Sequence, residues 1–413
     1  MLSWENASFK TLVTENLNQV SIESDAYGGI CQRAWVEIND RALAYNVRQL
    51  KSILSAKTKL MGVVKADAYG HGACQVSQTI LEAGADWLAV ATVPEGIELR
   101  LAGIEAPILI LGATDRPEQI QAIAHWQLQP TICTPQQALV FSETLSDYTK
   151  VMPVHLMLDT GMSRLGIPWQ EAVEFAKFVQ RLPNLKIASI YSHLATADSP
   201  DQTVMREQHQ RFEEAIRSYR IDGEGFSSDV QLHFANSAAT LTDNTLHYDM
   251  VRVGLALYGL YPAPHFHQKV NLKPAMQVKA RVTQVKTIEA GTGVSYGYQF
   301  IAKKRMRLAV VGIGYADGVP RNLSNKMKVI VRDKLIPQVG AITMDQLMLD
   351  VSAIPDLETG EVVTLLGEQG KYQISAEDWA NTLGTISWEI LCSFKHRLPR
   401  VGVGEWGSRG VGE

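Results

Sequence analysis

The sequence predicts an α/β protein: an N-terminal (β/α)8 TIM-type barrel followed by a mostly β C-terminal domain. The first observation is that short apolar runs alternate with segments of helical periodicity over roughly 230 residues, which is typical of parallel strands joined by helical crossovers. The second is that seven or eight such units can be counted, which favours a closed barrel over the alternative of a doubly wound open sheet. The third is a change of rhythm after residues 258–264, where two prolines precede alternating apolar and polar residues.

Composition excludes several classes of partner. The chain has 413 residues, 46% of them hydrophobic, with 39 Lys plus Arg against 43 Asp plus Glu and a formal net charge of -4. This balance gives no electrostatic reason to expect nucleic acid or a membrane as partner. The four cysteines, Cys31, Cys74, Cys133 and Cys392, are scattered, without a CxxC or Cys/His ligand spacing. They are typical of reduced thiols in a cytoplasmic protein and predict no metal site.

The barrel strands are predicted from apolar runs and the helices from the 3, 4, 7 spacing. The helical faces are Leu43, Val47 and Leu50 in the first helix, Ile97 and Leu101 in a short one, and Ala172, Phe175, Ala176 and Val179 in a later one. The predicted strands are 34–38, 60–64, 87–91, 108–111, 154–158, 187–191 and 232–235.

Four segments follow from this pattern. Residues 1–33 are acidic and lack a continuous apolar core, which indicates an N-terminal extension and neither a secretory nor a transit peptide. The barrel is placed at residues 34–269 and the β-rich domain at 270–400, with strands at 276–282, 308–313, 328–331 and 362–366. A glycine-rich tail is predicted for 401–413.

Lys65 is the first candidate for chemistry. It ends the apolar run Leu60–Val64 and precedes a turn with Tyr69, Gly70, His71 and Gly72. A lysine at the end of a buried strand has low-dielectric surroundings, which lower its pKa and favour the neutral amine. Such an amine can form the Schiff base that pyridoxal phosphate chemistry needs, although an ordinary strand-end lysine facing water gives the same local pattern.

More polar groups follow the later strands, where the active sites of such barrels lie. Ser237 opens a helix, and its hydroxyl together with the amides of Gly254 and Leu255 could bind a phosphate that Tyr69 also reaches. His193 is flat and could stack on a cofactor ring. The two arginines, Arg164 and Arg252, could bind a substrate carboxylate or a cofactor ring atom. Each residue also has an ordinary structural explanation, and it is their number at one rim that indicates a site.

The second domain contributes three loop motifs. They are Gly293-Val294-Ser295-Tyr296-Gly297, Gly312-Ile313-Gly314-Tyr315-Ala316-Asp317-Gly318 and Ala341-Ile342-Thr343-Met344-Asp345-Gln346. A tyrosine between small residues in a loop can reach into a neighbouring cleft, although a packed aromatic with a hydrogen-bonded hydroxyl is the more ordinary outcome.

Together these motifs resemble the alanine racemase family of fold-type III pyridoxal phosphate enzymes. The resemblance covers about residues 34–399 and rests on VVKADAYGHG, DTGMSRLG, YSHLATAD, HFANSAA, DMVRVGLALYG, GVSYG, GIGYADG and ITMDQ, in the family's order. It implies a barrel followed by a β domain, and a head-to-tail homodimer in which each subunit completes its partner's site. It also implies interconversion of L- and D-alanine, which supplies D-alanine for peptidoglycan.

The resemblance also implies residue roles. Lys65 would carry pyridoxal phosphate and act as one base, and Tyr296, reaching across from the partner subunit, would act on the opposite face. Arg164, Tyr315 and Met344 would bind the substrate. Tyr69, Ser237, Gly254 and Leu255 would hold the phosphate, with His193 and Arg252 near the ring.

The alternatives are a broader-specificity racemase, a fold-type III decarboxylase and a non-catalytic pyridoxal phosphate carrier. Arg252 argues against a decarboxylase, which would be expected to carry a carboxylate at the position that faces the ring nitrogen. The carrier would need neither the β domain nor a tyrosine from a partner.

Two positions depart from the family pattern. Met157 stands where the family often has a carbamylated lysine that pairs with the arginine at position 164, so a bound anion or another side chain is expected to substitute. Trp388 stands where a phosphate-binding tyrosine is frequent; an indole N–H can also donate to a phosphate, but its reach differs from that of a phenol.

Overall fold

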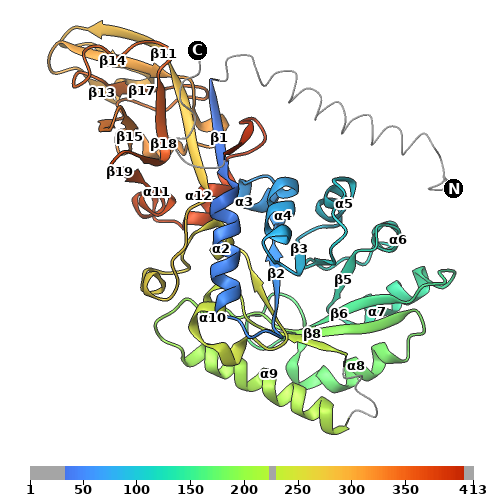
Figure 1. The fold of residues 1–413 in the computed structure, drawn as a ribbon. Helices are drawn as coiled ribbons and strands as arrows, with labels where there is room; N and C mark the ends of the chain where they lie inside the picture. The colour runs from blue at the N-terminus through green and yellow to red at the C-terminus, as the bar shows by residue number, and fades with distance from the viewer. Residues whose placement is uncertain (1–32, 223–228, 404–413) are drawn as a thin grey trace. The chain divides into compact units, whose positions relative to one another are not determined.

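The computed structural model describes residues 33–222 and 229–403, which form two compact units (Figure 1). The barrel unit is Asn39–Ala275, and the β unit combines residues 33–38 with Met276–Gly402. The predicted N-terminal extension lies outside the described residues except for Arg33, and residues 404–413 lie outside them as well. No helix among the described residues is long and apolar enough to cross a membrane.

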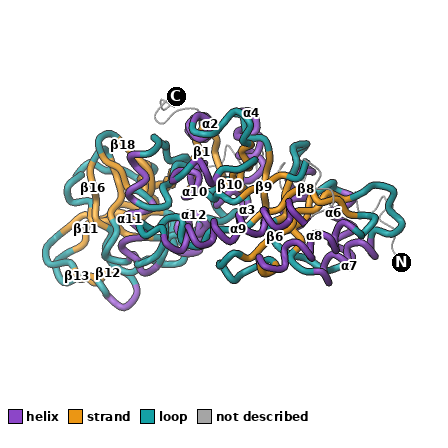
Figure 2. Tube along the Cα trace, turned by 90° about the horizontal axis from the view of Figure 1, so that it is seen from below, coloured by secondary structure: helices purple, strands orange, loops and turns teal. Residues whose placement is uncertain are grey.

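The barrel unit contains a closed parallel barrel of eight strands in the order β5-β4-β3-β2-β10-β9-β8-β6, which closes where β5 pairs with β6. Several of these strands can be followed side by side in Figure 2. The closure confirms the predicted barrel and shows that the open-sheet alternative is wrong. The strands are β2 (Lys59–Val63), β3 (Trp87–Val90), β4 (Ile108–Ile110), β5 (Gln129–Ile132), β6 (Met152–Asp159), β8 (Leu185–Tyr191), β9 (Gln231–His233) and β10 (Met250–Val253), with the short β7 (Ile167–Pro168) beside β6.

Helices follow the strands and bury one face each. They are α2 (Asp40–Ser52), α3 (Lys65–Gly70), α4 (Ala73–Glu82), α5 (Val93–Leu101), α6 (Pro117–His125), α7 (Pro135–Thr144), α8 (Ala172–Gln180), α9 (Thr203–Asp222) and α10 (Ser237–Thr242). The faces predicted for α2 and α8 are confirmed, since every predicted residue is buried.

The face predicted for α5 is wrong. Leu101 is exposed, and α5 buries Val93, Gly96 and Leu99 instead. A Cβ at Gly96 would lie 2.8 Å from a methyl group of Leu128, so the closest packing of this helix depends on a residue without a side chain. Hydrophobic periodicity does not detect such a face.

The β unit is mostly antiparallel. Its main sheet runs β16-β15-β18-β11-β1-β20, with β14 between β11 and β17 and with β19 beside β18. The strands are β1 (Ala34–Asn39), β11 (Met276–Ile288), β14 (Met306–Val311), β15 (Lys328–Val331), β16 (Lys334–Pro337), β17 (Leu347–Asp350), β18 (Val362–Gln369), β19 (Tyr372–Ile374) and β20 (Arg400–Val403), with the small hairpin β12 (Gly293–Val294) and β13 (Phe300–Ile301). Two helices, α11 (Ala376–Leu383) and α12 (Ser387–Ser393), complete the unit. The mostly β second part is thereby confirmed.

Two assignments near the chain ends are wrong. The strand at 34–38 exists but belongs to the β unit, where Val36 lies opposite Val278 in antiparallel register with β11. Its residues alternate between buried and half-buried, which suits a sheet covered on one face, whereas parallel barrel strands are continuously apolar. The predicted tail begins too early, because residues 401–403 belong to β20.

Candidate functional site

Arg252 is the buried centre of the barrel's carboxyl-end mouth. It belongs to β10, and only 3% of its surface is exposed. One guanidinium nitrogen, Nη1, donates to Nδ1 of His233 at 2.9 Å. The other, Nη2, donates to the Ser192 carbonyl at 2.7 Å and lies 3.1 Å from Nδ1 of His193. The guanidinium also lies 5.0 Å from the ring centre of Tyr191. Neutral partners therefore fix both terminal nitrogens of the guanidinium.

Four of the predicted residues affect one another electrostatically at this mouth. The pKa of His193 falls to about 3, mainly because the ring is buried and also because Arg252, Arg164 and Lys65 repel a further positive charge. Burial likewise lowers the pKa of Arg252 to about 10, and Arg164 adds to that effect. The imidazole is therefore neutral at physiological pH, and three cationic side chains surround it. Such a mouth attracts anionic groups.

The residues predicted to hold a phosphate also meet. The Ser237 hydroxyl oxygen accepts from the Gly254 amide at 3.1 Å and from the Ala256 amide at 3.5 Å. A Cβ at Gly254 would lie 2.6 Å from the Tyr69 hydroxyl, so the absence of a side chain here lets that phenol approach the backbone closely. Leu255 follows as the first residue of a short buried 3-10 turn. A hydroxyl, a phenol and backbone amides thus converge from three segments of the chain.

Lys65 begins α3, which is unusual because four of its residues are left-handed. Ala66, Asp67, Ala68 and Tyr69 have φ of 52–54°, a conformation that costs a non-glycine residue about 1–2 kcal/mol. This turn connects Lys65 to Tyr69, so strain is concentrated at the candidate site.

Three side-chain contacts stabilise the left-handed turn. The Glu95 carboxylate accepts from the Ala66 amide at 2.7 Å, and its second oxygen accepts from the amides of Ala91 and Thr92, just before α5. The Asp67 carboxylate accepts from the Ala73 amide at 2.8 Å. The buried ring of His71 lies 2.9 Å from the Ala68 carbonyl and stacks on Tyr258.

Arg164 lies in a loop organised by Asp159, whose carboxylate accepts from the amides of Gly161, Met162 and Ser163. The Arg164 side chain is exposed, whereas Met157 is buried in a cluster with Cys133, Tyr191 and Leu165. Burial raises the pKa of the Cys133 thiol to about 11, so the thiol is neutral. This cluster supplies no negative charge for Arg164, in line with the departure noted at Met157.

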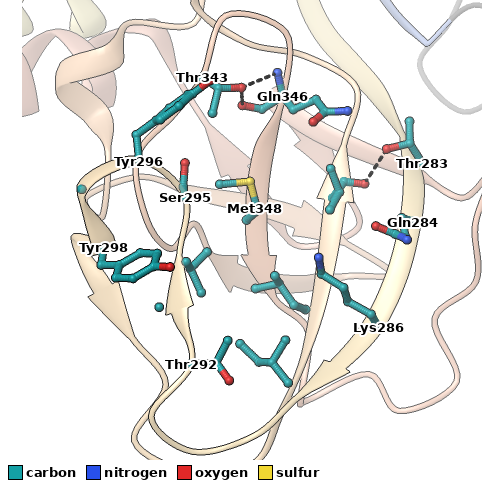
Figure 3. A pocket seen from close by; sticks show the side chains of 16 residues that line it. Thr283, Gln284, Lys286, Thr292, Ser295, Tyr296, Tyr298, Thr343, Gln346 and Met348 are labelled. Carbon is teal, nitrogen blue, oxygen red and sulfur yellow. Dashed lines mark hydrogen bonds between the residues drawn. The ribbon is translucent and has the colours of Figure 1, made fainter.

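The β unit carries the remaining predicted residues. Tyr296 and Tyr298 belong to a 3-10 turn and are 72% and 69% exposed. They line a groove of about 860 Å³ whose other walls come from β11, β12, β14 and residues 343–348 (Figure 3). Ser295 anchors this turn by donating to the Ala341 carbonyl at 2.7 Å.

Tyr315 and Met344 lie on two loops that are joined to each other by backbone hydrogen bonds. The Tyr315 amide donates to the Thr343 carbonyl and the Ala316 amide to the Met344 carbonyl, both at 3.0 Å. Tyr315 is 42% exposed and Met344 53%. Trp388, in α12, is half-buried within the same unit.

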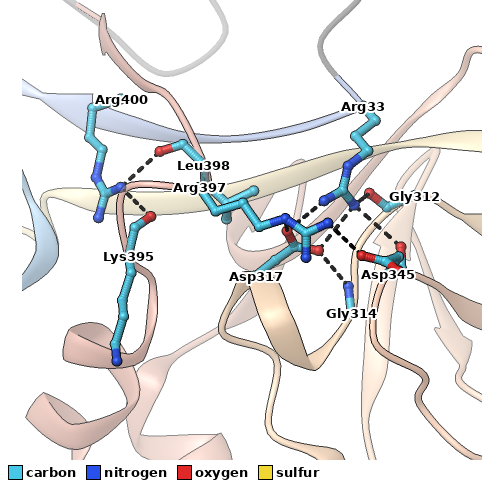
Figure 4. A network of polar contacts seen from close by, with 9 residues as sticks. All are labelled: Arg33, Gly312, Gly314, Asp317, Asp345, Lys395, Arg397, Leu398 and Arg400. Carbon is cyan, nitrogen blue, oxygen red and sulfur yellow. Dashed lines mark hydrogen bonds and ion pairs between the residues drawn. The ribbon is translucent and has the colours of Figure 1, made fainter. Parts of the chain in front are cut away.

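A set of charges, which we term the Asp317 network, fixes these two loops (Figure 4). Arg33 binds both carboxylate oxygens of Asp317, at 2.6 and 3.0 Å, and also donates to the backbone carbonyls of Gly312 and Asp345. Arg397 joins the carboxylates of Asp317 and Asp345. Asp317 is fully buried and also accepts from the Gly314 amide at 2.9 Å.

Sequence reasoning missed several of these residues. The sequence pattern places Arg33 in the extension and gives no role to Glu95, Arg397 or His233. It also gives none to Ser189 and His155, which form a hydrogen-bonded series with His233 inside the barrel. For His155 a signal existed, because a histidine interrupts the apolar run Val154–Leu158 of a strand buried on both faces. For Arg33, Glu95 and Arg397 we find no such local signal, since each acts on residues distant in sequence.

Comparison with known proteins gives one family. The family model described as "Alanine racemase, N-terminal domain" matches residues 38–262, and "Alanine racemase, C-terminal domain" matches 275–402. An alanine racemase of Nostoc sp. is 68% identical over 92% of this chain and 98% of its own length, and one of Synechocystis sp. is 60% identical over 90% and 99%. The solved alanine racemase of Bacillus anthracis, with bound L-Ala-P, is 35% identical, covers 91% of this chain and 97% of its own, and superposes with a TM-score of 0.85.

Proposed function

The chain belongs to the alanine racemase family and is an isomerase of that type, and from this premise we propose that it racemises alanine with pyridoxal phosphate and two bases, Lys65 and Tyr296. The observation that carries the proposal is that Lys65, Arg164 and His193 act electrostatically on one another at the barrel mouth with the buried Arg252, while Ser237, Gly254 and Tyr69 meet from three segments of the same unit. A supply of D-alanine for peptidoglycan is the role we infer for the product.

The mouth residues fit pyridoxal phosphate. Ser237, Tyr69 and the amides of Gly254 and Leu255 would hold its phosphate, and the glycine leaves the space that a Cβ would fill. Arg252 would face the ring nitrogen and His193 the ring. When bound, the cofactor supplies an electron-accepting ring that acidifies the Cα proton of an attached amino acid.

The protein's own residues would place the proton carriers, and they would limit how strongly the cofactor ring withdraws electrons from the substrate. Arg252 has donors only, so it could not accept a hydrogen bond from a protonated ring nitrogen; it would instead donate to that nitrogen and favour the unprotonated ring. A weaker electron sink suits reversible proton exchange more than decarboxylation. Arg164 would bind the substrate carboxylate, and the neutral His193 lies among cations without adding another.

Racemisation needs a proton removed from one face of Cα and returned to the other. Lys65 would serve one face and the phenol of Tyr296 the other. We further propose that Tyr296, Tyr315 and Met344 act in the site of a partner subunit in a homodimer. The β unit supports this proposal, because these three side chains and Tyr298 are large, apolar or aromatic, and between 42% and 72% exposed. Aromatic residues and methionine are enriched at subunit interfaces.

Alanine is the substrate class favoured by the family and by the L-Ala-P bound to the Bacillus anthracis relative. The cytoplasmic location predicted from the scattered cysteines stays a prediction.

The test compares the wild type with Tyr296→Phe, Lys65→Ala and a matched control, Tyr298→Phe, which removes an equally exposed phenol two residues away. We expect visible absorbance from bound pyridoxal phosphate in all but Lys65→Ala. D-alanine formation from L-alanine should fall at least about 100-fold in Tyr296→Phe and stay near the wild-type rate in Tyr298→Phe.

Two results would contradict parts of the proposal. Full activity in Tyr296→Phe would remove that residue as a base. Visible absorbance without D-alanine formation would leave the cofactor assignment intact and refute the substrate, and serine, lysine and arginine would be assayed next.

A further inference from the structure

Arg252 is the end of a hydrogen-bonded series inside the barrel, which we term the interior network: Arg252, His233, Ser189, His155 and Gln129. The distances are 2.9 Å from Arg252 Nη1 to His233 Nδ1, 2.8 Å from His233 Nε2 to Ser189 Oγ, 2.6 Å from Ser189 Oγ to His155 Nδ1 and 2.8 Å from His155 Nε2 to Gln129 Oε1. Both histidines and the serine are fully buried.

Each member stands on a different strand, and the strands β10, β9, β8, β6 and β5 are consecutive neighbours in the barrel. The first four are labelled in Figure 2. His155 points inward, since its ring meets Trp87 of β3 edge-on at 5.6 Å. Gln129 is the first residue of β5, at the end of the barrel opposite the mouth. The network therefore connects the two ends of the barrel.

The direction of every hydrogen bond follows from the chemistry of the two ends. Arg252 can only donate, so Nδ1 of His233 must accept and the proton of this imidazole must be on Nε2. That proton is donated to Ser189. Among the described residues the Ser189 side chain has only the two histidines as partners, so its own proton goes to Nδ1 of His155. His155 then carries its proton on Nε2 and donates it to the amide oxygen of Gln129, which can only accept.

We propose that Gln129, His155 and Ser189 are positioning residues for Arg252: they fix the Nε2-protonated, neutral tautomer of His233 and thereby the acceptor that holds the guanidinium at the mouth. The use that the enzyme makes of Arg252 rests on the proposed function, whereas the tautomers do not.

The electrostatics agree with this arrangement. Burial lowers the pKa of His155 to about 3, and burial together with Arg252 and then His155 lowers that of His233 well below its ordinary value. Neither ring gains a second proton near neutral pH, which would turn an acceptor into a donor and break the series.

The decisive variant reverses the donor-to-acceptor direction of the interior network, starting at Gln129. Gln129→Lys offers His155 a donor where it now finds an acceptor, which would shift the His155 proton to Nδ1, turn the serine and leave His233 with a proton facing Arg252. Gln129→Glu keeps an acceptor. Gln127→Lys is the matched control, because Gln127 is exposed and lines the same surface pocket as Gln129 but makes no contact with the network.

Two measurements are made on the full-length holoenzyme of each variant. Nitrogen-15 NMR of labelled histidines reports the tautomers, assigned with His155→Gln and His233→Gln. The steady-state kcat/KM for L-alanine reports the consequence at the mouth.

We expect Nε2-protonated neutral rings for His155 and His233 in the wild type, in Gln129→Glu and in Gln127→Lys. In Gln129→Lys we expect Nδ1-protonated His155 and a loss of at least about tenfold in kcat/KM, the size of effect that follows loss of a supporting partner.

The proposal is overturned if wild-type His155 or His233 is charged or Nδ1-protonated near pH 7. It is also overturned if Gln129→Lys matches Gln127→Lys in both tautomers and kcat/KM. If Gln129→Lys does not fold, Ser189→Ala interrupts the series with a smaller residue, and the wild-type tautomers alone still decide. Absence of D-alanine formation would refute the proposed function and leave the tautomer result unaffected.

Discussion

Gly254 is where a single atom decides whether the proposed phosphate site can form. The Tyr69 hydroxyl lies 2.6 Å from the place where a Cβ would stand. A side chain at this position therefore requires the Tyr69 phenol or the backbone to move. The Gly254 amide also donates to Ser237, so a displaced backbone would disturb two of the groups proposed to hold the phosphate.

We expect Gly254→Ala to weaken pyridoxal phosphate binding by about tenfold or more, because either Tyr69 or the backbone must move. The measurement is the dissociation constant of the cofactor from visible absorbance. Tyr69→Phe and the double variant serve as controls: removing the hydroxyl relieves the closest contact, so the two substitutions should be non-additive. Strict additivity would show that the clash is not the cause.

For single residues, the sequence predicts which side chains lie at the barrel mouth better than it predicts which side chains contact them. The Gly254 and Ser237 pair and the mouth residues Lys65, His193 and Arg252 are brought together as expected. The partners that hold them, His233 and Glu95, were not predicted, because no local pattern shows which strand neighbours which. The roles of all these residues stay predictions.

The left-handed α3 is the element with the clearest conflict between local preference and the fold. A β-strand followed by a right-handed helical turn is the usual continuation, yet four non-glycine residues here take positive φ. The contacts of Glu95, Asp67 and His71 maintain that conformation. No periodicity predicts it, since it depends on tertiary partners.

Ala66 allows this strain to be measured, because its side chain is exposed and its φ is 54°. We expect Ala66→Gly to raise the free energy of unfolding by about 0.5–1 kcal/mol, since glycine adopts this conformation without steric cost. Ala102→Gly is the control: Ala102 is exposed with φ of −76°, and there glycine should destabilise by about 0.5–1 kcal/mol. Denaturant unfolding gives both values, and equal signs for the two variants would contradict the strain.

The Asp317 network joins elements that the sequence separates widely, from Arg33 to Arg397. Sequence patterns predicted four strands of this unit, β11, β14, β15 and β18. They did not predict that a residue of the supposed extension fixes the loops of Tyr315 and Met344, because burial of an ion pair is a property of the assembled sheet.

Asp317→Asn is expected to destabilise the β unit by about 2 kcal/mol, because two arginines lose a buried anion while Arg33 can still be hydrated. It should also raise KM for alanine by loosening the loops of Tyr315 and Met344. Asp345→Asn is the matched control: its carboxylate is half exposed, so the loss should be at most about 1 kcal/mol. Thermal unfolding and steady-state kinetics measure both, and equal effects in the two variants would refute a special role for the buried carboxylate.

For the whole molecule, the central question is how the two proposed bases, Lys65 and Tyr296, come to act in one site. Lys65 belongs to the barrel unit and Tyr296 to the β unit. The sequence predicted this division of residues between barrel and β domain, since both types of domain show clear periodicity. It also led us to propose that the tyrosine acts in the partner's site, which the exposed aromatics of the β unit support.

Mixing two inactive variants tests that proposal directly. In a heterodimer of Lys65→Ala with Tyr296→Phe, a site shared between subunits combines the intact Lys65 of one protomer with the intact Tyr296 of the other, while the second site carries both substitutions. Random pairing makes half of the dimers mixed, so we expect co-expression to restore about one quarter of wild-type D-alanine formation. Each variant alone should be inactive, and Tyr298→Phe paired with Lys65→Ala provides the control for dilution. If each subunit used its own tyrosine, no mixed dimer would hold a complete site, and activity would stay at the level of the separate variants.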